Sequence, residues 1–290
     1  MYPVLSLQAI CYVFGKSRQA YYKNLIQVKE TGIKEAIIIK LVQEIRKDLP
    51  RIGGRKLFFM LEEPLVSHNI SIGRDQLFSV LSLYGLLVRK RRRTRPFTTD
   101  SNHPFRKYPN LIRELDITRP IQLWVSDITF ISLESGFCYL SLVTDAYSRK
   151  IVGHCLWHNQ KREMVVSALE MALEGVSIYG PHKLIHHSDR GLQYCSGDYT
   201  ALLSNNNVSI SMTEKSDPYE NAIAERVNGI LKEEFYLDLI FDDITVARET
   251  VDKAIFNYNH KRPHASCNYM TPHQAHQTTE KLKSKWRKKK

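Results

Sequence analysis

Three acidic residues lie in segments where their side chains could bind metal ions. Asp127 lies inside the apolar run IQLWVSDITFIS, where an ionised carboxylate needs a cation or hydrogen bonds to offset its desolvation. Asp189 follows the short run HKLIHH, and Glu225 lies in the helix-like segment NAIAERVNGILKEE. Carboxylate oxygens are the ligands that Mg²⁺ and Mn²⁺ prefer, and two such ions can clamp an in-line displacement at phosphorus. We therefore expect Asp127, Asp189 and Glu225 to be metal ligands and catalytic residues.

Side chains near these carboxylates allow functional and structural interpretations. At 3.6 residues per turn, Asn228 and Lys232 share a polar stripe with Glu225, and such a stripe is often an ordinary solvent face. We expect Asn228, Lys232 and Arg190 to bind nucleic acid, with Lys232 on a DNA phosphate. His187 could lie beside the phosphate path or at the edge of the core, and the residues alone leave both open.

Three further polar residues are expected to have structural roles. Asp145, with Ser148 and Arg149 close behind it, is typical of a turn cap rather than a metal ligand. Arg262 and His264, in the segment YNHKRPH, are expected to stabilise the C-terminal end or contact DNA rather than to do chemistry.

The elements that must position the carboxylates form an α/β pattern. Three apolar, β-branched runs with short links predict an antiparallel meander, and two shorter strands alternate with helices after it. The predicted strands are 121–132, 136–145, 150–157, 182–187 and 208–212. The predicted helices are 161–175, 197–206, 218–238 and 243–258. We expect Asp189 at the carboxyl end of its strand, which is the edge where open α/β sheets bind ligands.

Residues 1–88 predict an all-α front region built from helix-turn-helix units. Ser6 and Ser17 can cap two short helices that Gly15 separates, and Arg18 begins the second of them. Arg18 is a candidate DNA contact, because this residue type reaches phosphates and base edges. A plain helical hairpin explains the same residues equally well.

A basic segment and a basic tail flank the α/β region. The run RKRRRTR (89–95) opens a linker, 89–118, in which Arg91, Arg92 and Arg93 are expected to follow the DNA backbone. A spacer or a localisation signal is the alternative. We place the catalytic core with its C-terminal helix at 119–280 and a tail at 281–290.

The composition supports a nucleic-acid partner and argues against membrane insertion. The 290 residues include 42 Lys and Arg and 30 Asp and Glu, a net charge of +12. The excess lies in the front and the tail, which suits a polyanion. No run approaches the roughly 20 apolar residues of a membrane span, and the start lacks the features of a signal peptide. Five scattered cysteines with no CxxC pair indicate reduced thiols in a cytoplasmic protein.

The motifs, taken in order, resemble those of a known family. The carboxylates, with 35 residues (190–224) between the last two, are similar to the D, D, 35, E pattern of retroviral-integrase-like transposases. The segments HSDRGLQY, SDPYENAIAERVNGILKEE and YNHKRPH resemble the second-frame (OrfB-type) transposase of the family named for insertion sequence three. WVSDITFI and LVTDAYSRKIVG match its core, and Lys232 matches its basic residue seven positions after the glutamate. RIGGRKL departs from its more usual Tyr-Gly-Gly at Ile52.

The resemblance implies a fold, an activity and partners. The fold would be a ribonuclease-H-like (integrase) catalytic core with a mixed five-stranded sheet and flanking helices, preceded by an all-α helix-turn-helix domain. The enzyme would use two Mg²⁺ (or Mn²⁺) ions to cut double-stranded DNA at terminal inverted repeats and to join the ends to target DNA, typically through a circular intermediate. It would act as a homo-oligomer, at least a dimer on DNA, in the bacterial cytoplasm at the nucleoid.

The family also implies a first-frame helix-turn-helix protein as a fusion or partner. We expect this chain to lack that first-frame part. Two alternatives remain: a catalytically inactive DNA-binding or regulatory derivative, and a structure-specific nuclease on the same fold. The presence of Asp127, Asp189, Glu225 and Lys232 argues against the first, and the front region and the 35-residue spacing favour a transposase over the second.

Overall fold

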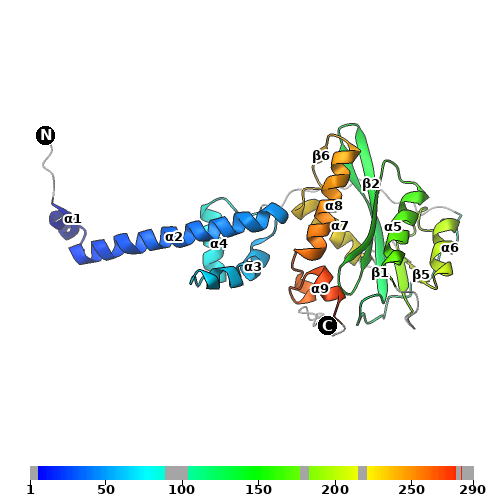
Figure 1. Cartoon of the computed structure of the whole chain (residues 1–290), viewed down its shortest axis with the longest axis horizontal. Helices are drawn as coiled ribbons and strands as arrows, with labels where there is room; N and C mark the ends of the chain where they lie inside the picture. Colours follow the sequence, from blue (N-terminus) through cyan, green and yellow to red (C-terminus); the bar gives the residue numbers. More distant parts are fainter. Residues whose placement is uncertain (1–5, 89–103, 177–182, 215–220, 279–281, 283–290) are drawn as a thin grey trace. The chain divides into compact units, whose positions relative to one another are not determined.

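A computed structural model describes residues 6–88, 104–176, 183–214, 221–278 and 282 of the chain. It divides into two compact units (Figure 1). The first comprises Met1–Lys47 and Gly53–Val88, and the second comprises Asp48–Ile52 and Arg89–Lys290. No described helix combines the length and the apolar content that crossing a membrane requires.

The first unit is helical. Its helices are α1 (Leu7–Val13), α2 (Arg18–Asp48), α3 (Gly54–Ser67) and α4 (Arg74–Leu83). The predicted caps are confirmed, because the hydroxyls of Ser6 and Ser17 accept from backbone N–H groups three residues on, and Gly15 turns the chain at a φ of 61°. The apolar sides of α3 and α4 form much of this unit's core, and Gly54 lies so close to Phe78 that a Cβ would be 2.8 Å from the ring.

The sequence reading of α2 needs a correction. We expected a short helix after Ser17, but a single helix of 31 residues runs from Arg18 to Asp48. Gly32 weakens a helix by about 1 kcal/mol and does not end it, because no proline follows within the helix.

The second unit is built on a mixed sheet. Its strands are β1 (Leu123–Leu133), β2 (Gly136–Asp145), β3 (Ile151–Trp157), β4 (Ile185–Ser188), β5 (Ser209–Met212) and β6 (Ile240–Phe241). The order is β3-β2-β1-β4-β5, with the first three antiparallel and with β4 and β5 parallel to β1. All five predicted strands are confirmed, and the two-residue β6, which pairs with the far end of β1, was not predicted.

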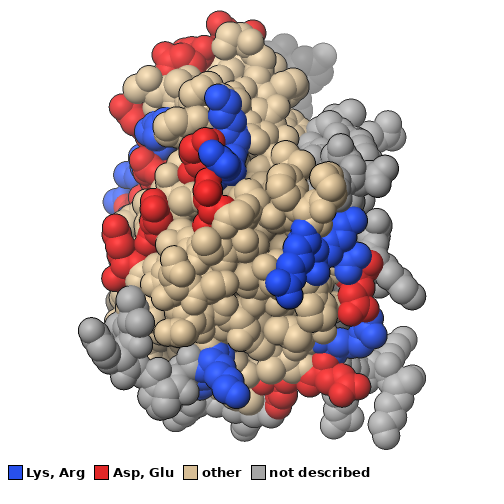
Figure 2. All heavy atoms as spheres, turned by 90° about the vertical axis from the view of Figure 1, so that its right-hand side faces the viewer, with Lys and Arg blue, Asp and Glu red and all other residues tan. Residues whose placement is uncertain are grey.

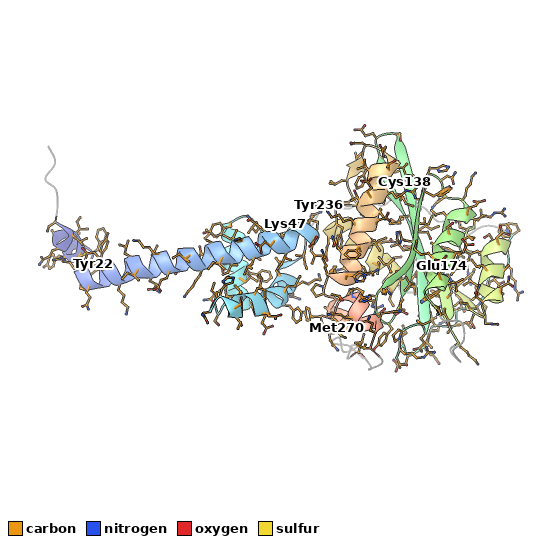
Figure 3. All side chains as sticks on the ribbon, in the orientation of Figure 1. Tyr22, Lys47, Cys138, Glu174, Tyr236 and Met270 are labelled. Atoms are coloured by element: carbon orange, nitrogen blue, oxygen red, sulfur yellow. The ribbon has the colours of Figure 1, made fainter. Side chains whose placement is uncertain are left out.

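Helices cover both faces of this sheet (Figure 1). One face carries α5 (Arg162–Glu174) and α6 (Gly197–Asn205), and the other carries α7 (Ala222–Glu234) and α8 (Ile244–His260), with a 3-10 turn (Ala265–Cys267) and α9 (Pro272–His276) at the end. The alternation along β1 explains this: Trp124 packs with α5 and α6, whereas Leu123 and Val125 pack with Ala224 of α7. All five cysteines are free thiols, among them the buried Cys138 on β2 (Figure 3).

A gap in strand pairing lies along one edge of β1. Strand β4 pairs only with the first part of β1, up to Val125, and β6 pairs with its end at Ser132 and Leu133. On this edge of the described sheet, no strand lies beside the residues between these two pairings, although β2 pairs with them on the other edge. Asp127 is one of them, so the sheet itself opens a space next to this carboxylate.

Residues 48–52 lie with the second unit, although helices of the first unit flank them. The Arg51 N–H donates to the Glu234 carbonyl at the end of α7, and the Arg51 guanidinium lies 3.7 Å from Asp238. Asp48 accepts a 2.8 Å hydrogen bond from Lys261. This short segment therefore covers the ends of α7 and α8.

Candidate active site

Asp127 lies in the gap beside β1, and its side chain is directed toward α7. One carboxylate oxygen accepts from the Ile128 N–H at 2.9 Å, and the other accepts from the Asn228 amide at 2.8 Å. Burial, the charge of Asp189 and, less strongly, that of Glu225 together raise the pKa of Asp127 to about 7. The hydrogen bond from Asn228 opposes this rise. Asp127 therefore lies in the field of both other expected ligands.

Asp189 follows β4 at its carboxyl end, as the sequence predicted. Because β4 runs parallel to β1, this end lies at the same sheet edge as the gap. The Gly191 N–H donates to the carboxylate at 3.0 Å. The φ of Gly191 is not positive, but a Cβ there would lie 3.0 Å from the Asp189 oxygen, so the small size of this residue leaves room for the carboxylate.

Glu225 lies on α7, and its charge acts on Asp127. The polar stripe of this helix does not face solvent as a whole: Asn221, one turn before Glu225, donates to the Ser126 carbonyl at 3.0 Å, and Asn228 donates to Asp127. Both asparagines are buried, whereas Glu225 is exposed. Two amides thus fix α7 on β1 and direct the intervening carboxylate toward the open edge.

Asn228 was expected to bind DNA, and the structure corrects this. Its side chain is only 5% exposed, and its amide is hydrogen-bonded to Asp127. Helical periodicity identified the stripe but could not show that the stripe packs on a carboxylate of the sheet.

The three carboxylates suit hard cations by chemistry. Their oxygen donors come from a strand, a strand end and a helix, and the charges act on one another. Among the described residues, no three acidic, histidine or cysteine side chains lie ready in coordinating geometry. The carboxylates would therefore have to draw closer around bound ions.

The expected DNA-binding residues have different positions. Lys232, two turns after Glu225, holds its ammonium 3.8 Å from the centre of the Phe130 ring. Arg190 directly follows Asp189 and is half-buried. Arg18 is the first residue of α2 in the other unit. Arg91, Arg92 and Arg93 lie outside the described residues.

The histidines before Asp189 belong to the core. His187 is fully buried and shares a 2.8 Å hydrogen bond with Ser211 of β5, so it does not lie beside a phosphate path. His186 bonds to Ser126 and Tyr199, and burial together with the neighbouring His187 lowers the pKa of His186 to about 3. His186 is therefore neutral at physiological pH.

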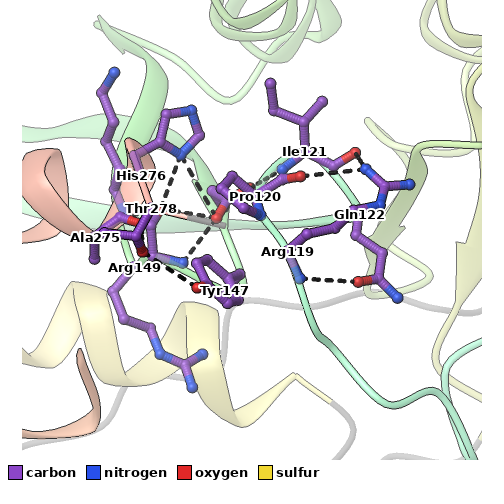
Figure 4. A network of polar contacts seen from close by, with 12 residues as sticks. Arg119, Pro120, Ile121, Gln122, Tyr147, Arg149, Ala275, His276 and Thr278 are labelled. Atoms are coloured by element: carbon purple, nitrogen blue, oxygen red, sulfur yellow. Dashed lines mark hydrogen bonds and ion pairs between the residues drawn. The ribbon is translucent and has the colours of Figure 1, made fainter. Parts of the chain in front are cut away.

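Asp145 is a structural cap, as predicted. Its buried carboxylate accepts from the Ser148 N–H and hydroxyl and from the Ile121 N–H, all within 2.8 Å. Burial alone would raise the pKa of Asp145, but His276, 3.7 Å away, and these N–H groups lower it overall. Figure 4 shows His276 and Ile121 meeting at this network, which joins the end of the chain to the turn between β2 and β3.

Sequence reasoning missed the partner of Arg262. This guanidinium is almost fully buried and makes two hydrogen bonds, at 2.7 and 2.8 Å, to the carboxylate of Glu234 at the end of α7. The pair anchors the helix that carries Glu225, which confirms a stabilising role for Arg262. In the sequence, the only sign of this pair was the acidic residue Glu234 at the end of the predicted helix.

The chain is similar to several known proteins. Residues 117–218 and 206–272 match two family models, each described as an integrase core domain. An uncharacterized 31 kDa protein of insertion element IS600 from Shigella sonnei is 34% identical over 270 residues, which cover 91% of this chain and 96% of that protein. The transposase InsF for insertion sequence IS3A of Escherichia coli K12 is 34% identical over 160 residues, covering 53% of this chain and 54% of that protein. The magnesium-bound catalytic core of HTLV-2 integrase covers 55% of this chain and 97% of its own at a TM-score of 0.44 and 17% identity.

A sheet of this order between two helical layers is the ribonuclease-H-like fold, and its residues match the integrase core. The predicted fold class, with a helical region before the core, is therefore confirmed. Within that class, the chain belongs to the IS3 family of insertion-sequence transposases, as its motifs predicted.

Proposed function

We propose that this transposase cleaves DNA at the 3′ ends of its element and joins them to a second DNA site, with Asp127, Asp189 and Glu225 binding two Mg²⁺ or Mn²⁺ ions. The strongest support is the electrostatics of Asp127, whose pKa is raised to about 7 with both other carboxylates among the causes. Carboxylates that repel one another in this way are stabilised by divalent cations. When bound, two ions would activate the attacking hydroxyl or water and stabilise the leaving 3′ oxygen.

The chain's own residues would orient these ligands. Asn228 would hold one oxygen of Asp127 so that the other lone pairs face the gap, and the Gly191 N–H would hold Asp189. Asn221 would fix the start of α7. Such hydrogen bonds around a metal site typically change metal affinity or activity by about 10–100-fold.

DNA binding would be shared between regions of different charge. Figure 2 views the second unit from the side of α5 and α6, where the described Lys and Arg side chains form separate groups and Asp and Glu side chains lie along the left margin and beside the basic groups. We therefore assign recognition of terminal repeats to residues 1–88, including Arg18, and phosphate binding to the linker 89–118 and the tail 281–290. Lys232 and Arg190 would contact phosphates of double-stranded DNA at the core, 119–280. Two DNA ends require at least a dimer, with a first-frame protein as a further partner.

A strand-transfer assay tests this function. The purified chain would be mixed with a labelled duplex that carries its terminal repeat, with Mg²⁺ or with EDTA, and nicked and joined products would be resolved. Wild type should give metal-dependent joined product, and Asp127→Asn, Asp189→Asn and Glu225→Gln should each give none while binding the duplex normally. Glu174→Gln, an exposed acid of α5 (Figure 3), is the matched control and should remain active.

Other products would indicate a different function. Cutting without joining, even with the first-frame partner added, would indicate a nuclease. Binding with neither product under the same conditions would indicate a regulatory DNA-binding protein. Full activity in any of the three carboxylate variants would refute the site.

A further inference from the structure

Four aromatic side chains share one face of the sheet. In the strand register, Phe130 of β1 lies opposite Tyr139 of β2, and Tyr139 lies opposite Trp157 of β3. Phe137, two residues before Tyr139, points to the same face, and its ring meets that of Phe130 edge to face at 5.4 Å. We call these four residues the aromatic row.

The aromatic row lies on the α5 side of the sheet, beside the start of that helix. Gly153 of β3 lies against Ala168 and Ala172 in the later part of α5, so α5 runs back along β3 and begins near Trp157. The side chains of Phe137 and Trp157 are consequently 56% and 36% exposed, whereas Tyr139 packs partly on the core. Contiguous exposed aromatic surface of this kind marks a binding site.

One end of the aromatic row lies near Asp127 along β1, and cationic side chains lie near both ends of the row. Phe130 lies three residues after Asp127, where the edge of β1 away from β2 is unpaired in the described sheet, and its side chain points to the face opposite that of Asp127. The ammonium of Lys232 lies 3.8 Å from the centre of its ring. At the other end of the row, the exposed Lys161 precedes α5, whose first residue, Arg162, forms ion pairs with Asp198 and Glu163. Aromatic faces between cations suit a chain of bases and phosphates better than an apolar protein surface.

We propose that the aromatic row stacks unpaired DNA bases next to the cut site. This inference rests on the proposed function, because it deepens the choice of substrate: the preferred DNA would have unpaired nucleotides near the reacting end. Every base offers a π face, so stacking would need no particular sequence. Lys232 would contact the phosphate beside the base on Phe130.

The test measures DNA binding in EDTA, so it does not depend on metal or cleavage. Two fluorescent duplexes with the same terminal repeat would be compared, one blunt and one with three unpaired nucleotides at the end, using Phe137→Ala and Trp157→Ala. We expect affinity for the unpaired end to fall by about 5–100-fold in each variant, and affinity for the blunt end to change less than about twofold. Trp157→Phe should retain most of the binding.

Phe256→Ala is the matched control, because Phe256 is an equally exposed aromatic residue on α8, on the opposite face of the sheet. It should leave both affinities unchanged. Phe137 is the more exposed member of the pair, so its variant keeps the test valid if Trp157→Ala folds poorly. A 2-aminopurine base in the unpaired segment should lose fluorescence on binding wild type and keep it with Phe137→Ala.

Two outcomes would overturn the inference, and a further comparison separates it from the proposed function. Equal losses for the blunt and unpaired duplexes would show that the row does not recognise unpaired bases. Unchanged DNA binding with a lower sedimentation mass of Phe137→Ala would show an interface between copies of the chain. Loss of strand transfer in Glu225→Gln together with intact stacking would leave both proposals standing, whereas stacking without any strand transfer in wild type would refute only the proposed function.

Discussion

Replacing Asp127 by asparagine should make the metal-free protein more stable. Near neutral pH and above, Asp127 ionises in a partly buried site in the field of Asp189 and Glu225, which raises its pKa from 3.8 to about 7. An asparagine has nearly the same shape and no charge. The substitution therefore removes the cost of burying a charge and the repulsion from Asp189 and Glu225, while leaving the gap beside β1 intact.

The size of the effect follows from linkage. A pKa raised from 3.8 to about 7 corresponds to about 4 kcal/mol of destabilisation at pH 8, as an upper bound. Asparagine can replace only one of the two acceptor oxygens that Ile128 and Asn228 use, which costs about 1 kcal/mol. The net gain is about 1–3 kcal/mol, or roughly 2–10 °C in melting temperature for a chain of this size.

The destabilisation caused by Asp127 should depend on pH. Because the pKa is raised in the folded protein, the destabilisation is absent below about pH 4, grows as pH rises toward 7 and is complete above it. The difference in melting temperature between Asp127→Asn and wild type should follow the same course. Differential scanning fluorimetry in EDTA from pH 4.5 to 8.5 measures it, with Glu174→Gln as the control for the loss of one negative charge.

Adding Mg²⁺ completes the experiment. It should raise the melting temperature of wild type in proportion to binding and leave Asp127→Asn nearly unchanged. A variant that melts below wild type at pH 8 in EDTA, or a difference that does not change with pH, would refute the account of repulsion among the three carboxylates.

Three further substitutions test how the site is held. Gly153→Ala should lower stability by about 1–3 kcal/mol or more, because the new Cβ would lie 2.0 Å from a backbone oxygen of α5; an unchanged urea midpoint would contradict this packing. Arg262→Met should cost about 3–5 kcal/mol by leaving Glu234 without its buried partner, and adding Glu234→Gln should recover part of the loss; if the double variant is no more stable than the single one, the pair is not the cause. Asn228→Ala should raise the pKa of Asp127 further and weaken Mg²⁺ binding by about 10–100-fold in calorimetry, whereas a surface DNA contact would leave metal affinity unaltered.

The strands and the order of the three carboxylates along the chain could be predicted, because the sequence patterns that indicate them lie within single segments. Alternating apolar residues identified β1 to β5, and the apolar context of Asp127 showed that its charge needed compensation. The parallel pairing of β4 with β1 then brings Asp189 to the same edge.

What the sequence could not show depends on contacts between distant segments. Helical periodicity identified the polar stripe of α7, but only packing reveals that Asn228 faces Asp127. The partner of Arg262, 28 residues away, and the pairing of β6 with β1 are of the same kind. The aromatic row likewise depends on the register of three strands, which no single segment contains.

The place of Asp48–Ile52 in the second unit changes how the protein can be divided. The backbone passes from one compact unit to the other three times, after Lys47, after Ile52 and after Val88. A fragment that begins after Val88 would lose the segment 48–52, in which Arg51 bonds to the end of α7. A protease cut between residues 88 and 104, by contrast, would leave the segment 48–52 bound to the second unit. The two pieces should therefore remain together as a nicked complex until they are denatured.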